Sequence, residues 1–167
     1  MLSTNQNFRS IIKATGSYVP EKVVTNQDLE KIVDTSDEWI FQRSGIKSRH
    51  IAEKDQTTSD MAIKAARQAL ERSGLSAEDI DGVIVATTTP DNTFPAVAVK
   101  VQAALNIAPG LAFDVQAVCS GFVYALSTAD AFIRSGQLKN VLVVGAEKMS
   151  SIVNWEDRTT CVLFADG

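Results

Sequence analysis

The chain has 167 residues, of which 45% are hydrophobic and 22% charged, the balance of a globular protein and not of a disordered one. Its 16 Lys and Arg residues against 20 Asp and Glu residues give a net charge of −4 without a basic stripe, which disfavours nucleic-acid binding. His50 is the single histidine, so chemistry that needs two imidazoles cannot be carried out by this segment alone.

The hydrophobic period changes repeatedly between those of strands and helices, which predicts an α/β fold with parallel strands. We expect Asn26 and either Ser36 or Asp37 to cap the first two helices, and Gly45 and Gly74 to end the second and third. In chain order the expected elements are a strand over 11–18, helices over 26–32, 37–41 and 59–74, a strand over 83–86, a helix over 95–105, a strand over 112–115, a helix over 120–135, and strands over 141–144 and 161–164.

The helix expected over 120–135 is unusual, because residues 115–129 contain no charged side chain. Its large apolar residues do not fall on one stripe, and a helix that is apolar around its circumference is buried around its circumference. We therefore expect this helix to need a second partner beyond the rest of the chain.

Cys119 lies where a strand is expected to turn into this helix, in the sequence Asp114-Val-Gln-Ala-Val-Cys-Ser-Gly-Phe122. A thiol at a helix N-terminus lies near the positive end of the helix dipole, which favours the thiolate, and a nearby backbone N–H can stabilise an oxyanion. The pattern fits a catalytic nucleophile, and it fits equally well a buried, inert cysteine in a capping turn.

The second cysteine, Cys161, lies in an apolar stretch and is interpreted as a core residue. The two cysteines are far apart and form no C-x-x-C pair, so we expect neither a structural metal site nor a disulfide scaffold. Residues 1–10 lack the apolar stretch of a secretory signal, and no apolar run approaches the ~20 residues of a membrane span. We expect a cytoplasmic protein without a membrane partner.

Trp39 and Arg43 are four residues apart on an expected helix and therefore share a face. An indole and a guanidinium plane both suit stacking on a flat heterocycle, and arginine also pairs with phosphate. Arg158 either joins them or pairs with a carboxylate. The alternative is a tryptophan that anchors its helix beside solvated arginines. His50 is expected in a loop, and only a local argument would pair it with Cys119.

Seven short motifs are shared, in order, with one enzyme family. They are Gly16-Ser-Tyr-Val-Pro20, Asp34-Thr-Ser-Asp-Glu-Trp-Ile40, Arg43-Ser-Gly-Ile46, Arg49-His-Ile51, Phe113-Asp-Val115, Cys119-Ser-Gly-Phe122 and Phe164-Ala-Asp-Gly167. Together they closely resemble β-ketoacyl-[acyl carrier protein] synthase III, the condensing enzyme that initiates type II fatty acid synthesis.

The resemblance implies a thiolase-like fold, in which two similar halves pack into five layers. Residues 1–167 would form one N-terminal half-domain, with the order βαβαβαββ and a mixed, mostly parallel five-stranded sheet. The charge-free helix would then be one of two central helices between the two sheets. In this family an acetyl group passes from acetyl-CoA to a cysteine, and decarboxylation of malonyl-acyl carrier protein gives the carbanion that attacks the thioester.

The family's functional residues can be carried over by matching motifs. Cys119 matches the nucleophile, and Phe94 and Met149 match the acyl pocket, Phe94 reaching across a homodimer interface into the partner's pocket. The coenzyme A contacts match Thr35, Trp39, Arg43 and Arg158, of which Trp39 and Arg158 would enclose the adenine. Coenzyme A enters as the thioester substrate, and no further cofactor is expected.

Three features depart from the family pattern. Ser44 stands where threonine is common, and Thr159 stands where glycine is common, so close approach of the backbone to the coenzyme is less certain there. The family's catalytic histidine and asparagine belong to the second half, whereas His50 matches the Arg-His-Ile motif. We therefore expect the isolated 167 residues not to catalyse condensation.

Two other interpretations remain open at this point. One is a related condensing enzyme of secondary metabolism with a different acyl starter or acceptor. The other is a non-catalytic module that serves in folding or dimerisation, with an unreactive Cys119. A cysteine hydrolase is disfavoured because no histidine is available as its base.

Overall fold

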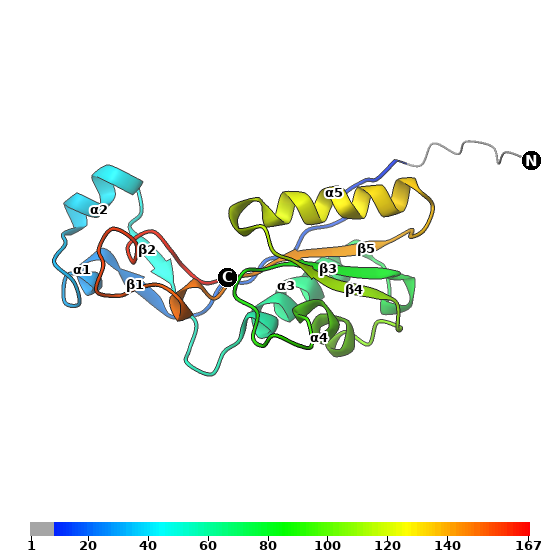
Figure 1. Ribbon diagram of the computed structural model, residues 1–167, viewed down its shortest axis with the longest axis horizontal. Coiled ribbons are helices and arrows are strands. Elements are labelled where there is room, and N and C mark those ends of the chain that lie inside the picture. The colour runs from blue at the N-terminus through cyan, green and yellow to red at the C-terminus, as the bar shows by residue number, and fades with distance from the viewer. Residues whose placement is uncertain (1–8) are drawn as a thin grey trace, which may run out of the picture.

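A computed structural model describes residues 9–167, and the part of the polar N-terminal stretch that precedes residue 9 lies outside the described residues. The chain forms a three-stranded parallel sheet covered by helices, with a smaller lobe at one end (Figure 1). No helix in residues 9–167 combines the length and the apolar character needed to cross a membrane.

The sheet is built around β3 (Gly82–Ala86), which lies between β4 (Leu111–Val115) and β5 (Val141–Gly145). Both neighbours run parallel to β3, with Ile84 aligned to Phe113 on one side and Val143 on the other. Every residue of β3 is buried, as its uninterrupted apolar sequence predicts for a strand covered on both faces. The three central strands expected from sequence are thereby confirmed to within one residue at each end.

Alternate residues of β3 pack into two different cores. Val83 and Val85 face α3 (Thr58–Ser73) and α4 (Val97–Ala104), in a core that contains Ala62, Ala66 and Val101 among others. Ile84 and Ala86 face the opposite way and contact Ala125 and Ala129 of α5 (Gly121–Arg134). The helices α3 and α4 thus cover one face of the sheet and α5 covers the other (Figure 1).

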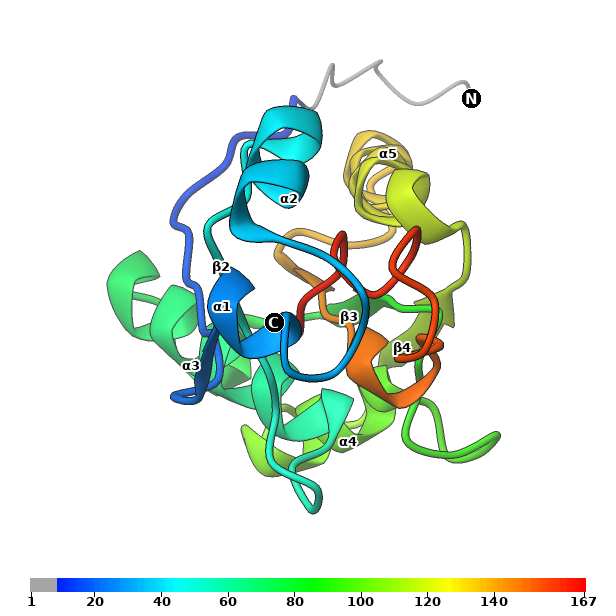
Figure 2. The same cartoon turned by 90° about the vertical axis from the view of Figure 1, so that its left-hand side faces the viewer.

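The smaller lobe contains the antiparallel pair β1 (Val23–Thr25) and β2 (Ser48–His50), with α1 (Asn26–Leu29) and α2 (Asp37–Ser44) between them in sequence. Figure 2 looks onto this lobe, with the chain after β5 returning beside α1 and α2. A third core joins the two segments, since Leu29 and Ile40 pack with the fully buried Cys161 and Val162. The antiparallel pair β1–β2 was not expected from the sequence.

The helices are capped by the residue types that the sequence predicts, but two of the N-caps lie at a different residue from the one expected. Ser36 caps α2 through a hydrogen bond from the Trp39 N–H, and Gly45 ends it in the left-handed conformation, at φ 72°. Asn26, however, is the first residue of α1, and the cap is Thr25. Likewise α3 is capped by Thr57 and not by Ser59. In both shifted cases a threonine hydroxyl and an aspartate three residues later form a capping box.

The helix α4 begins at Val97, two residues later than the expected start at Pro95. Its N-cap position holds Ala96, which offers no side-chain acceptor, and the free N–H groups of Val97 and Ala98 instead donate to the two carboxylate oxygens of Asp114, each at 2.8 Å. The helix start is therefore set by a residue of β4, 17 positions along the chain.

The expected sheet of five strands is wrong for the outer two. Residues 11–18 are not part of a strand ladder: Ile11 and Ile12 are exposed, and Gly16 and Ser17 lie against α3. Residues 161–164 form turns, because the Cys161 N–H donates to the Asp157 carbonyl and the Leu163 N–H to the Thr160 carbonyl. Of the two apolar segments that were expected to be strands, residues 11–18 therefore run extended beside α3, and residues 161–164 place Cys161 and Val162 in the core of the smaller lobe.

The outer face of α5 is left uncovered within residues 9–167. Its small residues Gly121, Ala125 and Ala129 are buried against the sheet. Its large apolar side chains Phe122, Val123, Tyr124 and Leu126 are exposed. This confirms the expectation that the helix presents more apolar surface than the chain itself covers.

Candidate functional site

Cys119 is exposed and lies in the single turn of 3₁₀-helix Val118–Ser120 that joins β4 to α5. Ser120, at the N-cap position of α5, makes no side-chain capping hydrogen bond, and the first turn of α5 contains no acidic residue. The positive end of the helix dipole is therefore not neutralised by the side chains beside it. Within residues 9–167 the cysteine is therefore not buried, unlike what the interpretation as an inert capping residue expects.

The backbone that presents Cys119 is strained. Val118 has φ 45°, in the left-handed region, and this conformation is costly for a β-branched residue. Such a sharp turn between a strand and a helix is a recurrent way to expose a nucleophile. Gly121 completes the turn, because a Cβ at this position would lie 3.2 Å from Cβ of Ala86, and glycine allows α5 to approach β3 closely.

Cys161 and His50, the other two side chains considered for nucleophilic or base chemistry, are engaged elsewhere in the structure. Cys161 is buried, and burial raises the pKa of its thiol, which confirms its interpretation as a core residue. His50 lies in β2 and not in a loop, with its Nδ1 hydrogen-bonded to the Pro20 carbonyl. The residues that the structure describes place no imidazole in contact with Cys119.

Two guanidinium groups lie over the indole of Trp39. The Cζ atom of Arg43 lies 4.4 Å from the ring centroid, as their spacing on α2 predicts. The Cζ atom of Arg158 lies 4.8 Å from the same centroid, although this residue is 119 positions away in the sequence. The structure thus brings together three of the residues that the sequence resemblance groups around a coenzyme.

Arg158 is fixed by the loop between α1 and α2. Its Nη1 donates to the Asp34 carbonyl at 3.0 Å, and it lines a surface hollow of about 500 Å³ together with Asp34, Asp157 and Thr159. Thr35 follows in the same loop, and its hydroxyl oxygen is buried without a hydrogen-bond partner in residues 9–167. A buried hydroxyl without a hydrogen-bond partner is uncommon in folded proteins.

The two residues matched to the acyl pocket lie in different settings. Phe94, in the loop before α4, has 82% of its side chain exposed. Met149 is partly buried at the start of the 3₁₀-helix Met149–Ser151 that follows β5. Neither residue belongs to the hydrophobic cluster against which Trp39 packs within residues 9–167.

A parallel sheet places the carboxyl ends of its strands at one edge, and here that edge faces the smaller lobe. The chain leaves β5 at Gly145 and passes directly into this lobe (Figure 1). Because β4 runs parallel to β5, Cys119, which follows β4, lies at the same edge. Parallel α/β sheets bind ligands at this edge.

A partly buried carboxylate at the same edge of the sheet was not predicted from the sequence. Glu147 accepts hydrogen bonds from the N–H groups of Thr88 at 2.8 Å and Thr89 at 3.0 Å, and from two threonine hydroxyls. It ties the loop after β3 to the chain after β5. The available signal was three consecutive threonines before a proline, together with an acidic residue just after the strand expected over 141–144.

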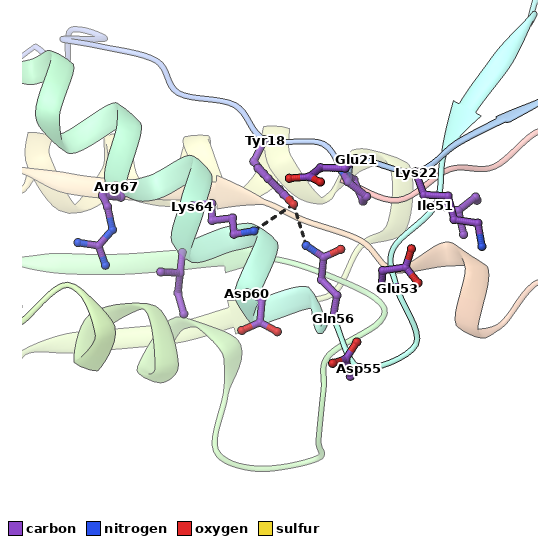
Figure 3. Close-up of a pocket in the computed structure, with 12 residues that line it drawn as sticks. Tyr18, Glu21, Lys22, Ile51, Glu53, Asp55, Gln56, Asp60, Lys64 and Arg67 are labelled. Atoms are coloured by element: carbon purple, nitrogen blue, oxygen red, sulfur yellow. Dashed lines mark hydrogen bonds between the residues drawn. The ribbon is translucent and has the colours of Figure 1, made fainter.

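A separate hollow of about 600 Å³ lies between α3, the segment 18–22 and the loop 51–56 (Figure 3). Tyr18 lies at its centre, where its hydroxyl accepts hydrogen bonds from Lys64 at 3.1 Å and Gln56 at 2.9 Å. These two bonds, the one from Lys64 first, lower the pKa of Tyr18. None of the predicted site residues lines this hollow.

Comparison with known proteins identifies the group to which these features belong. The sequence profile described as 3-Oxoacyl-[acyl-carrier-protein (ACP)] synthase III matches residues 113–167. The β-ketoacyl-[acyl-carrier-protein] synthase III of Rhodospirillum centenum is 61% identical over 160 residues, which cover 96% of this chain and 50% of that protein. The chain belongs to the β-ketoacyl-[acyl-carrier-protein] synthase III family. It spans about half the length of the curated relatives it matches, namely their N-terminal half.

Solved structures of synthase III relatives confirm the thiolase-like fold. The 3-oxoacyl-[acyl-carrier-protein] synthase III of Aquifex aeolicus is 57% identical, with a TM-score of 0.91 over 93% of this chain and 50% of that one. A priming β-ketosynthase from a polyketide biosynthetic pathway is 37% identical, with a TM-score of 0.95 over 99% of this chain and 50% of that one.

Proposed function

We propose that this segment supplies the nucleophile and the coenzyme-binding residues of an acyltransferase that initiates fatty acid synthesis. The substrates would be acetyl-CoA and malonyl-acyl carrier protein, and the product acetoacetyl-acyl carrier protein. The observation that carries the proposal is the exposed Cys119 at an uncapped helix N-terminus, in a chain whose Trp39 and Arg158 form a separate stacking site.

In the first step, Cys119 Sγ attacks the thioester carbonyl carbon of acetyl-CoA. The new S–C bond forms as the bond to the coenzyme sulfur breaks, and the coenzyme leaves as a thiolate that takes up a proton. Negative charge develops on the carbonyl oxygen during the attack. The Ser120 N–H already donates to the Ala117 carbonyl and the Gly121 N–H to the Val118 carbonyl, so in this turn the N–H groups of Val118 and Cys119 are the donors that would stabilise it.

The same residues would hold the coenzyme. The adenine would insert between Trp39 and Arg158, Arg43 would pair with a phosphate, and the Thr35 hydroxyl would gain the hydrogen bond that it lacks. Coenzyme A takes part as a substrate, so this proposal involves no resident cofactor.

In the second step, malonyl-acyl carrier protein loses carbon dioxide, and its carbanion attacks the acetyl thioester of Cys119. The C–C bond forms as the thioester bond breaks, which regenerates the Cys119 thiolate. The imidazole of His50 is engaged with Pro20, so the groups that stabilise the carbanion would come from outside this segment.

Two further parts of the proposal concern assembly and location. The exposure of Phe94 supports a homodimer in which this ring enters the acyl pocket of the partner, of which Met149 would form part of the wall. We place the enzyme in the cytoplasm, where its carrier-protein substrate would be made.

A second candidate function is priming of a polyketide or related secondary metabolite. It is favoured by the high structural similarity to the priming β-ketosynthase described above. The two candidates share the chemistry at Cys119 and differ in the acyl starter that the pocket accepts.

The test is a condensation assay with the full-length natural protein, malonyl-acyl carrier protein and a panel of acyl-CoA starters. The proposal predicts acetoacetyl product with acetyl-CoA at the highest kcat/KM, and none from a Cys119→Ala variant. A preference for longer or branched starters would favour the secondary-metabolism candidate. Condensation that survives loss of the Cys119 thiol would refute both.

A further inference from the structure

The proposed coenzyme site is divided between two segments of the chain that are far apart in sequence. Trp39 and Arg43 belong to α2, in the segment 21–50, whereas Arg158 belongs to the turns that follow β5. Figure 2 shows these two segments side by side in the smaller lobe. Any group that fixes their relative position also fixes the distance between the Trp39 ring and the Arg158 guanidinium.

Arg49 is placed to do this. Its side chain extends from β2, is only 3% exposed, and donates to backbone carbonyls of both segments. Its Nη1 donates to Val24 at 3.3 Å and its Nη2 donates to Val162 at 3.1 Å. Within residues 9–167 no other group donates to the Val162 carbonyl.

The environment of Arg49 is costly for a cation. It pairs with no carboxylate in the part of the chain that the structure describes, and its Nε is buried without a partner. Burial lowers the pKa of Arg49 from its ordinary value. Removing such a group while keeping its apolar stem need not unfold the protein, because buried charges often contribute little net stability.

Val162 is connected to Arg158 by a short stretch of chain that includes a hydrogen-bonded turn. The Asp157 carbonyl accepts the N–H groups of both Thr160 and Cys161, which closes the turn that contains Arg158. Cys161 and Val162 then enter the core beside Leu29 and Ile40. A shift of Val162 therefore displaces this turn as a unit and moves Arg158 away from Trp39.

We propose that Arg49 is a positioning residue that sets the affinity for the coenzyme thioester by holding the Arg158 turn against α2. It does not itself contact the coenzyme or the reacting atoms. This inference rests on the proposed function, since it concerns the same coenzyme site. It predicts an effect on binding of acetyl-CoA and none on the chemistry at Cys119.

The experiment uses the full-length protein with four variants: Arg49→Met, Arg49→Lys, Trp39→Ala and Arg72→Met. The methionine keeps the apolar stem and removes all donors, whereas lysine keeps the charge and can reach only one carbonyl at a time. Arg72 is the matched control, because it also donates to a backbone carbonyl, that of Thr15, but on the α3 side of the molecule. The measurements are KM and kcat for acetyl-CoA, and the alkylation rate of Cys119 by iodoacetamide without substrate.

We expect Arg49→Met to raise KM about tenfold because, of its two lost hydrogen bonds, the one to Val162 is the bond that holds the Arg158 turn. Arg49→Lys should give a smaller rise, with kcat and the alkylation rate within about twofold of wild type in both variants, and Arg72→Met should change nothing. An unchanged KM in Arg49→Met, or a fall in kcat at constant KM, would overturn the inference. If Arg49→Met does not fold, Arg49→Lys decides the comparison. A KM of Arg49→Lys equal to that of wild type would then overturn the inference.

The wild-type and Trp39→Ala proteins separate this inference from the function on which it rests. Saturable use of acetyl-CoA by wild type, weakened in Trp39→Ala, supports the proposed coenzyme site whatever the Arg49 variants do. If wild type does not use acetyl-CoA at all, the proposed function fails and the role of Arg49 fails with it.

Discussion

Replacing Arg158 by alanine tests the proposed stacking site with little risk to the fold. The side chain is 43% exposed, and its carboxylate neighbour, Asp34, is fully exposed and 3.9 Å away. An ion pair of this kind contributes at most about 1 kcal/mol to stability. We therefore expect the melting temperature of Arg158→Ala to stay close to that of wild type.

The expected loss of binding follows from the geometry around Trp39. A flat ring between Trp39 and Arg158 needs roughly 3.5 Å on each side, or about 7 Å in all, whereas Cζ of Arg158 now lies 4.8 Å from the indole centroid. Binding must rotate the Arg158 side chain outward while its turn stays in place against α2, and exchange its contact with Trp39, of about 0.5–1 kcal/mol, for one with the adenine. Stacking on a base contributes about 1–3 kcal/mol, so the middle of the two ranges leaves about 1.3 kcal/mol net.

This difference corresponds to a dissociation constant about tenfold higher in Arg158→Ala. Titration calorimetry with coenzyme A in the full-length protein measures it directly, and Arg158→Lys is the control that keeps the charge without the planar group. We expect the lysine variant to recover only part of the affinity. Equal affinity in wild type and Arg158→Ala would refute the stacking geometry, and full recovery with lysine would show that charge alone matters.

Three further predictions concern the framework of the site. Asp114→Asn should lower the free energy of unfolding by about 1–2 kcal/mol in a denaturant titration, because α4 loses its charged cap; an unchanged value contradicts this role. Burial raises the pKa of Asp91, but its hydrogen bonds from Lys100 and from the Ser59 N–H outweigh this and lower it overall. A carboxyl group with a lowered pKa in the folded state stabilises that state at pH values above the ordinary carboxyl pKa, near 4. This stabilisation is lost as the pH falls through the pKa of the folded state. Wild type should therefore lose more stability than Asp91→Asn between pH 5 and pH 2. Equal acid sensitivity would contradict it. At neutral pH iodoacetamide should modify Cys119 and leave Cys161 unmodified until the protein unfolds, and modification of both at similar rates would contradict the burial of Cys161.

The parts of the fold that the sequence predicted well are those determined by local pattern. The strands near Val83 and Val141 are uninterrupted apolar runs, the strand near Ala112 is apolar except for Asp114, and the caps at Ser36 and Gly45 follow from the conformations that these residues prefer. The extended segment 11–18 carries a strand-like sequence yet forms no ladder. Whether such a segment pairs depends on which edge it reaches, and this is a property of the tertiary structure.

The candidate site divides in the same way. The stacking of Trp39 and Arg43 follows from their spacing on one helix, whereas nothing local connects Arg158 to them, and only the family resemblance did so. The burial of Arg49 was not predicted, because it lies in the polar sequence Lys47-Ser-Arg-His50, which looks like an exposed loop. Contacts between residues more than 100 positions apart give no periodic signal in a single sequence.

The central claim is that Cys119 accepts an acyl group from a coenzyme A thioester. The most direct measurement is peptide mapping by mass spectrometry after the full-length protein is incubated with acetyl-CoA and no carrier protein. The account predicts one acetylated peptide, the one that contains Cys119, with the peptide of Cys161 unmodified and the acetyl group lost after malonyl-acyl carrier protein is added. An unmodified Cys119 peptide, or acetylation at another residue that survives in Cys119→Ala, would contradict it.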